Sequence, residues 1–321
     1  SSLISCLVII FLLNDILTKK HLRNFPTDLV EFDFRPWQKL RNQTNIICHN
    51  NPNFCKFIKK KEYKNIYIIG DSHMSVLMYD FKKRYVDDSK LNLITMTTGC
   101  LGLPGFEFKK NGVVLNDICN SDYYDEVLKT VNSSKNNLVI LGGRFPLYLS
   151  DGDYFNNKEG GIESEGEKFY KLTNISNNIN VSDGYIKFIN DLLNSSSNLI
   201  LIYPIPEVGF NVPRRIFNSI KQNKNSYDNS ILEKNKITTS YKRYIERTHK
   251  TFETFKKINN KKLIRIYPEK IFCNKISNRC ITHTDDEILY SDSNHLSISG
   301  ARILNDVIIN ELNKLNYLFN Y

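Results

Sequence analysis

Short runs of isoleucine, leucine and valine alternate with longer amphipathic segments from about residue 66 onward. Near-continuous apolar strands separated by helices are typical of a parallel sheet that is covered on both faces. Strands are predicted at residues 66–69, 91–96, 138–141, 199–203 and 263–266. Helices are predicted at residues 74–85, 123–131, 184–193, 240–258 and 299–315. The alternation therefore predicts an α/β domain over residues 63–321, with a central parallel sheet of about five strands.

Two segments depart from this alternation. Residues 21–62 lack strong periodicity and are predicted to form a linker and packing arm. Residues 149–180 are rich in Gly, Asn and Glu and are predicted to be an insertion. Irregular segments of that length near strand ends are usually functional or mobile. Whether this one is a lid does not follow from the sequence.

The N-terminal segment is apolar from residue 3 to residue 13, apart from Ser5, and is followed by a basic flank. Because a membrane-spanning helix needs about 20 apolar residues, this run is too short to cross a bilayer by itself. Residues 1–20 are therefore predicted to be the end of a transmembrane helix. A signal-peptide core and a buried amphipathic helix are the alternatives.

Six of the seven cysteines fall into local pairs, and Cys6 lies in the apolar run. An even number in such pairs favours disulfides and an oxidising compartment, although the sequence does not choose their connectivity. The basic flank would instead favour a cytoplasmic location, and we give the cysteines more weight. The pairs are Cys48/Cys55, Cys100/Cys119 and Cys273/Cys280.

The net charge of +10 would suit an anionic partner. The basic residues are scattered along the chain and form no single stripe, and no nucleic-acid-binding motif accompanies them. We therefore expect no nucleic-acid partner. An acidic glycan or a solvated basic surface remains compatible with this charge.

The motif Gly70-Asp71-Ser72-His73 joins the first predicted strand to the following helix. Functional sites of doubly wound sheets gather at the carboxyl ends of strands. A serine placed there lies at a helix N-terminus, where free N–H groups stabilise developing negative charge. This position suits a nucleophile for acyl transfer. A simple helix cap at Asp71 or Ser72 is the alternative.

A second motif, Asp292-Ser293-Asn294-His295, lies between the last predicted strand and the last helix. The spacing of Asp292 and His295 allows the carboxylate to hold one imidazole nitrogen while the other faces Ser72. The alternative is a surface histidine beside a capping Ser297. Since both motifs can meet at one edge of the sheet, together they predict a Ser72–His295–Asp292 triad.

At these motifs the chain resembles the SGNH hydrolase family. The closer resemblance is to the C-terminal SGNH domain of membrane acyltransferases of the acyltransferase-3 type, which O-acylate cell-surface glycans. It spans roughly residues 45 to 315 and implies a three-layer, flavodoxin-like SGNH fold. The segments that carry it are Gly70-Asp71-Ser72-His73, Thr98-Gly99-Cys100, Leu141-Gly142-Gly143-Arg144-Phe145, Tyr203-Pro204-Ile205-Pro206-Glu207-Val208-Gly209 and Asp292-Ser293-Asn294-His295-Leu296-Ser297.

The family's oxyanion donors are the serine N–H, a glycine of its second sequence block and an asparagine side chain of its third. Here the third block lacks the asparagine and reads Gly142-Gly143-Arg144. The resemblance favours Gly99 as one donor, with Gly102 as a rival, and Arg144 as a cationic donor or a structural ion-pair partner. The proline-rich segment that follows the fourth strand carries Glu207, which is expected either in the wall of a substrate groove or in a strand terminator.

The resemblance implies an extracytoplasmic O-acyl transferase, usually of acetyl, with a cell-surface polysaccharide as acceptor. A membrane domain in the same full-length chain would deliver the acyl group from a donor such as acetyl-CoA. This domain itself would need no cofactor and no metal, and would lie on the periplasmic side of a bacterial inner membrane. A carbohydrate O-acyl esterase is the first alternative, and a non-catalytic glycan-binding module is the second.

Overall fold

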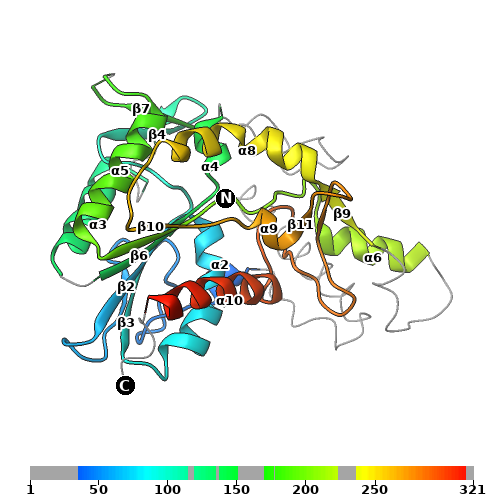
Figure 1. Cartoon of the computed structure of the whole chain (residues 1–321), viewed down its shortest axis with the longest axis horizontal. Helices are drawn as coiled ribbons and strands as arrows, with labels where there is room; N and C mark the ends of the chain where they lie inside the picture. Colours follow the sequence, from blue (N-terminus) through cyan, green and yellow to red (C-terminus); the bar gives the residue numbers. More distant parts are fainter. Residues whose placement is uncertain are drawn as a thin grey trace, which may run out of the picture.

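A central sheet of six strands organises the molecule (Figure 1). The structure is a computed structural model that describes residues 35–114, 119–134, 137–150, 170–176, 178–222 and 236–315. The strands lie in the order β1-β3-β2-β6-β8-β10, and all pairs are parallel except β1 with β3. Their bounds are β1 Cys55–Phe57, β2 Lys64–Gly70, β3 Leu91–Thr97, β6 Asn137–Gly142, β8 Asn198–Ile202 and β10 Leu263–Ile266.

The order of the parallel strands makes the sheet doubly wound. The chain begins the parallel part at β2, adds β3 on one side and then adds β6, β8 and β10 on the other. The direction of winding therefore changes between β2 and β6. In open α/β sheets, ligands bind outside the carboxyl ends of the strands at such a switch point. The segment that follows β2 is thus the first place to search for a site.

Helices cover both faces of the sheet (Figure 1). Alternate residues of β2 point to opposite faces, so that Ile66 and Ile68 join one buried apolar cluster while Tyr67 and Ile69 join the other. The first cluster contains the helices α2 (Ser72–Phe81) and α10 (Ile298–Lys314). The second contains α3 (Ser121–Asn132), α5 (Val181–Ser195) and α8 (Tyr241–Lys256).

Smaller elements surround this three-layer core. One three-stranded sheet contains β5, β4 and β7, and another contains β11, β12 and β9. Their bounds are β4 Phe106–Lys110, β5 Val113–Val114, β7 Tyr170–Asn174, β9 Thr238–Ser240, β11 Cys273–Asn274 and β12 Arg279–Ile281. The other helical elements of the described residues are η2 Pro36–Gln38, η3 Lys82–Val86, α4 Phe145–Leu149, α6 Val212–Gln222 and α9 Glu269–Phe272.

The α/β architecture predicted from the sequence is confirmed, and the structure adds elements to it. The segment predicted as a linker and packing arm also supplies η2 and β1, the latter as the sixth, antiparallel edge strand. The helix predicted over residues 74–85 is α2 followed by the π-helical turn η3. Helix α6 was not predicted, because its Pro213 and the prolines before it favoured a loop.

Three disulfides pair the cysteines as the local pairs suggested: Cys48 with Cys55, Cys100 with Cys119, and Cys273 with Cys280. The predicted end of a membrane helix at residues 1–20, and most of the predicted insertion at 149–180, lie outside the described residues. Within the described ranges, no helix combines the length and the apolar character that a membrane span requires.

Candidate active site

The turn that joins β2 to α2 places Ser72 at the start of a helix. A side chain at Gly70 would collide with the Gly142 carbonyl oxygen and with Met74, because β6 and α2 approach the backbone closely there. Asp71 caps α2, since its Oδ1 accepts a hydrogen bond from the His73 N–H at 2.9 Å. Ser72 is therefore the first residue of α2 and is partly exposed.

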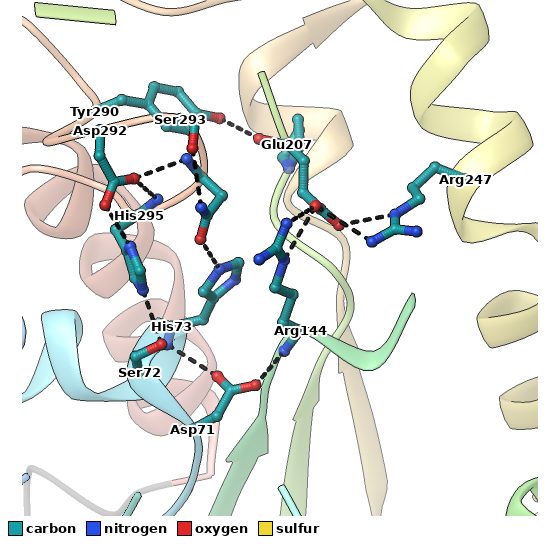
Figure 2. A network of polar contacts seen from close by, with 12 residues as sticks. Asp71, Ser72, His73, Arg144, Glu207, Arg247, Tyr290, Asp292, Ser293 and His295 are labelled. Atoms are coloured by element: carbon teal, nitrogen blue, oxygen red, sulfur yellow. Dashed lines mark hydrogen bonds and ion pairs between the residues drawn. The ribbon is translucent and has the colours of Figure 1, made fainter. Parts of the chain in front are cut away.

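Ser72, His295 and Asp292 form a continuous chain of hydrogen bonds (Figure 2). The distance from Ser72 Oγ to His295 Nε2 is 2.8 Å, and the distance from His295 Nδ1 to Asp292 Oδ2 is 2.6 Å. An ionised Asp292 can only accept, so Nδ1 carries the proton and Nε2 is left to accept from the serine hydroxyl. This is the geometry of a nucleophile, a general base and a carboxylate that orients the base.

Asp292 is itself held by the backbone of its own loop. Its Oδ1 accepts hydrogen bonds from the N–H groups of Asn294 and His295, each at 2.8 Å. Burial raises the pKa of Asp292, but the charge of His295 and these hydrogen bonds outweigh it and hold the pKa well below its ordinary value. Asp292 is therefore ionised at neutral pH and able to stabilise an imidazolium.

A buried carboxylate, Asp71, connects the first turn of α2 to the segment after β6. Its Oδ2 accepts from the Arg144 N–H at 2.7 Å and from the Tyr148 hydroxyl at 2.8 Å. Burial raises the pKa of Tyr148 well above its ordinary value, and the nearby Asp71 raises it further. Tyr148 therefore acts as a neutral donor that holds Asp71 in place.

His73 joins the same turn to the loop that carries His295. Its Nε2 lies 2.8 Å from Asn294 Oδ1, so the ring donates to the amide, and its ring meets the His295 ring edge-on (Figure 2). Burial lowers the pKa of His73, and it is therefore neutral at physiological pH. Its Nδ1 is buried without a hydrogen-bond partner among the described residues.

The segment before β2 also reaches the site. The indole of Trp37, in η2, lies 4.4 Å from the His295 ring between centroids. His49 Nδ1 lies 2.7 Å from Ser75 Oγ, one turn after Ser72 on α2. Burial lowers the pKa of His49 to about 4, and Asp71 partly opposes this shift. The predicted packing arm therefore forms one side of the site.

Arg144 and Glu207 meet in a buried ion pair that Arg247 completes (Figure 2). The Arg144 guanidinium donates to Glu207 Oε2, and Arg247 Nε donates to Oε1 at 3.1 Å. Burial raises the pKa of Glu207, but the charges of Arg144 and Arg247 prevail and lower it to about 2. These contacts agree with the expectation of Arg144 as an ion-pair partner and place Glu207 in the interior, 4% exposed.

The two glycines predicted near the oxyanion position differ in environment. Gly99 is exposed, and its N–H donates to Asn50 Oδ1 at 2.6 Å. Gly102 is buried, and a side chain there would collide with the Tyr124 ring and the Cys119 carbonyl. Of the two, only Gly99 lies where a substrate could approach it.

Sequence reasoning found the three members of the hydrogen-bonded chain but missed its neighbours. Trp37, His49 and Asn50 come from a segment without periodicity, and their one signal was the Cys48/Cys55 pair that flanks two of them. Among the described residues, no group of three or more His, Cys, Asp or Glu side chains is placed to hold a metal ion.

A family-level comparison matches most of the chain. The profile described as "SGNH domain (fused to AT3 domains)" matches residues 41–310. No curated protein matches the chain.

Solved structures of similar proteins share little sequence identity with the chain. The periplasmic domain of a lipopolysaccharide acetyltransferase from Salmonella ser. Paratyphi A is 18% identical, with a TM-score of 0.48, over 83% of this chain and 91% of that one. The salicylyl-acyltransferase SsfX3 of a tetracycline biosynthetic pathway is 10% identical, with a TM-score of 0.35, over 81% and 56%. The protein YXIM from Bacillus subtilis is 14% identical, with a TM-score of 0.31, over 79% and 57%.

Proposed function

Because the chain belongs to the family of SGNH domains that are fused to AT3 domains, we propose that it transfers an O-acyl group through an acyl-enzyme on Ser72. The observation that carries this proposal is the chain of hydrogen bonds from Ser72 through His295 to Asp292. The acyl group is acetyl and the acceptor is a hydroxyl of a cell-surface polysaccharide. Both assignments are part of the proposal, and the resemblance to membrane acyltransferases that O-acylate cell-surface glycans supports them.

Each half-reaction uses the same three side chains. Ser72 Oγ attacks the carbonyl carbon of the incoming acyl ester while His295 Nε2 takes the hydroxyl proton. The tetrahedral intermediate collapses, and His295 returns the proton to the leaving oxygen. An acceptor hydroxyl then attacks the acyl-enzyme while His295 takes its proton, and the second intermediate collapses as Ser72 Oγ leaves and takes that proton from His295. Asp292 stabilises the imidazolium in both halves.

The same family association supports an extracytoplasmic location, with a membrane domain of the full-length chain delivering the acyl group. The three disulfides support an oxidising compartment such as the periplasm. This domain needs no cofactor for the chemistry above. The acyl donor, such as acetyl-CoA, belongs to the membrane domain.

Hydrolysis of a carbohydrate O-acyl ester is the second candidate, because Ser72 is partly exposed and water can reach it. An activated acetyl ester tests the shared first half-reaction. Ser72→Ala should lower its turnover by at least ~10³-fold. Ser121→Ala is the matched control, since Ser121 also opens a helix, α3, but its hydroxyl bonds to Gly105 and Asp125 and not to a histidine. Equal turnover by wild type and Ser72→Ala would refute the proposal.

An acceptor glycan separates transfer from hydrolysis. With an O-deacetylated polysaccharide present, a transferase forms acetylated sugar that mass spectrometry detects, whereas an esterase releases acetate only. A third possibility, a binding module without turnover, would retain the glycan equally in wild type and in His295→Ala. The missing asparagine after β6 is the observation that favours this third possibility.

A further inference from the structure

The end of β6 supplies no side-chain amide for an oxyanion. The residues there are Gly142, Gly143 and Arg144, and the Arg144 guanidinium is bound to Glu207. A tetrahedral intermediate nevertheless needs more than one donor, since removing a single donor typically costs ~10²–10³ in rate. The Ser72 N–H at the start of α2 is one donor, because the first N–H groups of a helix have no partner within it. The N–H of Gly99, the donor that the resemblance favoured, already donates to Asn50 Oδ1, so another donor must come from elsewhere.

Asn50 is anchored at the carboxyl end of β3, beside the end of β2. Its N–H donates to the Thr97 carbonyl at 2.9 Å, and its Oδ1 accepts from the Gly99 N–H at 2.6 Å. The neighbouring Thr98 N–H donates a hydrogen bond to the Gly70 carbonyl at 3.1 Å. Since Gly70 lies two residues before Ser72, Asn50 is fixed to the edge of the sheet from which the serine projects.

The residue before Asn50 fixes the same segment to α2. His49 Nδ1 donates to Ser75 Oγ, whose hydroxyl donates to the Asp71 carbonyl at 3.2 Å. The Cys48–Cys55 disulfide closes the segment into a small loop. Residues 48–55 therefore bridge the first turn of α2, which begins with Ser72, and the end of β3.

The hydrogen bond from Gly99 fixes which way the carboxamide of Asn50 faces. The atom that accepts from an N–H must be oxygen, and the other end of the group is then the Nδ2 amide with its two donors. No described residue accepts from Nδ2, and Asn50 is exposed. The backbone φ of Asn50 is +61°, which lies in the left-handed region. Among residues with side chains, asparagine is one of the few that adopt this region readily.

We propose that Asn50 is a catalytic residue whose Nδ2 donates to the oxyanion, in place of the asparagine that is missing after β6. This inference rests on the proposed acyl transfer. As Ser72 Oγ bonds to the carbonyl carbon, the π electrons move onto the carbonyl oxygen and the serine proton moves to His295 Nε2. The Ser72 N–H and Asn50 Nδ2 hold the resulting oxyanion until it collapses and expels the leaving oxygen, which takes the proton. Gly99 orients Asn50 through its N–H.

Two substitutions test the donor. Asn50→Gly removes the carboxamide and keeps the left-handed backbone without strain. Asn50→Asp keeps an acceptor for the Gly99 N–H but removes the donor. Both should lower kcat for p-nitrophenyl acetate by ~10²–10³-fold, with KM and the melting temperature near those of wild type. Asn45→Gly is the matched control, because Asn45 is exposed with a φ of +62° and makes no contact with Gly99.

Several outcomes would overturn the inference. Asn50→Gly activity within a factor of about three of wild type would show that Nδ2 is not a donor. Wild-type activity in Asn50→Asp would show that the side chain only braces Gly99. Higher activity in Asn50→Gly would show that Asn50 blocks the oxyanion position.

The proposed function can fail separately, through equal ester turnover by Ser72→Ala and wild type, or through no turnover by wild type. In either case, the role of Asn50 as a donor can be tested by measuring the rate at which an alkyl fluorophosphonate labels Ser72. This phosphonylation also builds negative charge on an oxygen. We expect it to slow by at least ~10-fold in Asn50→Gly and not in Asn45→Gly. Equal labelling rates in the two variants would overturn the inference.

Discussion

The indole of Trp37 lies against the imidazole of His295, with 4.4 Å between the ring centroids and 35° between the ring planes. Trp37 belongs to the segment before the first strand, whereas His295 lies just before the last helix. The contact limits the rotation of the imidazole. It also places an aromatic ring beside the positive charge that His295 acquires when it takes the serine proton.

Replacing Trp37 should slow acylation without unfolding the domain. An aromatic ring beside a cation contributes about 1 kcal/mol, so Trp37→Leu should lower kcat/KM for an activated acetyl ester by about 5-fold. Trp37→Phe keeps a ring and should lose less. Steady-state kinetics should therefore rank kcat/KM as wild type, then Trp37→Phe, then Trp37→Leu. Equal values for Leu and Phe would mean that the ring itself does not matter.

Trp37 is the only tryptophan of the chain, so it reports on His295 directly. Its emission spectrum should differ between wild type and His295→Asn, because the substitution removes the imidazole that lies against the indole. The emission of His249→Asn, a control at a distant histidine, should match that of wild type. Identical emission from wild type and His295→Asn would contradict the contact.

The bond between His73 and Asn294 should couple α2 to the His295 loop. Asn294→Ala leaves the buried His73 ring without its acceptor and should destabilise the domain by about 1–3 kcal/mol. His73→Phe removes the partner instead. In urea unfolding, the double variant should be more stable than the sum of the two single losses predicts. Strict additivity of the two losses would show that the bond contributes nothing.

Two of the disulfides form a matched pair, because Cys48–Cys55 and Cys273–Cys280 have the same sequence separation of 7. Loop-closure entropy gives each a stabilisation of about 2–3 kcal/mol. Replacing either pair by serine should therefore lower stability by similar amounts. Only the loss of Cys48–Cys55 should lower kcat strongly, because that loop carries His49 and Asn50. An equal effect of both replacements on kcat would contradict this difference.

His49 should make the domain less stable in weak acid. Burial lowers its pKa from 6.5 to about 4, so between these pH values the unfolded chain binds a proton that the folded protein does not. Stability is therefore full above pH 6.5 and falls as the pH drops toward 4, by roughly 3 kcal/mol for this group. Urea unfolding at several pH values should show a smaller loss in His49→Gln. The same slope in both proteins would rule out His49 as the cause.

The strands of the core could be predicted because each buries both faces, which leaves an unbroken run of Ile, Leu and Val. Strand β1 could not, since Cys55–Phe57 is a three-residue edge strand whose pairing depends on β3. Helix α6 was not predicted because Pro213 favours a loop in sequence analysis, although proline is tolerated in the first turn of a helix. Short elements that tertiary contacts stabilise carry little pattern of their own.

Some residues of the candidate site could likewise be predicted from the sequence, and others could not. Ser72, Asp292 and His295 stand in motifs whose chemistry depends on residue type and local spacing, so they could be named from the sequence. Trp37 and Asn50 reach the site only through contacts with distant residues, His295 and Gly99. No local pattern encodes such a contact. The glycine at position 99 suggested an oxyanion donor, and its partner became visible only in the fold.

Ser72 and His295 are separated by 223 residues, nearly the full span of the domain. During synthesis, a chain that has passed β2 already carries its serine but has no base to activate it. The Ser72 hydroxyl is not activated as a nucleophile until α10 docks against α2 and brings the loop that carries His295 into place. The proposed acyl chemistry thus requires that α10 has docked on α2, so a chain in which this contact has not formed carries a serine without its base.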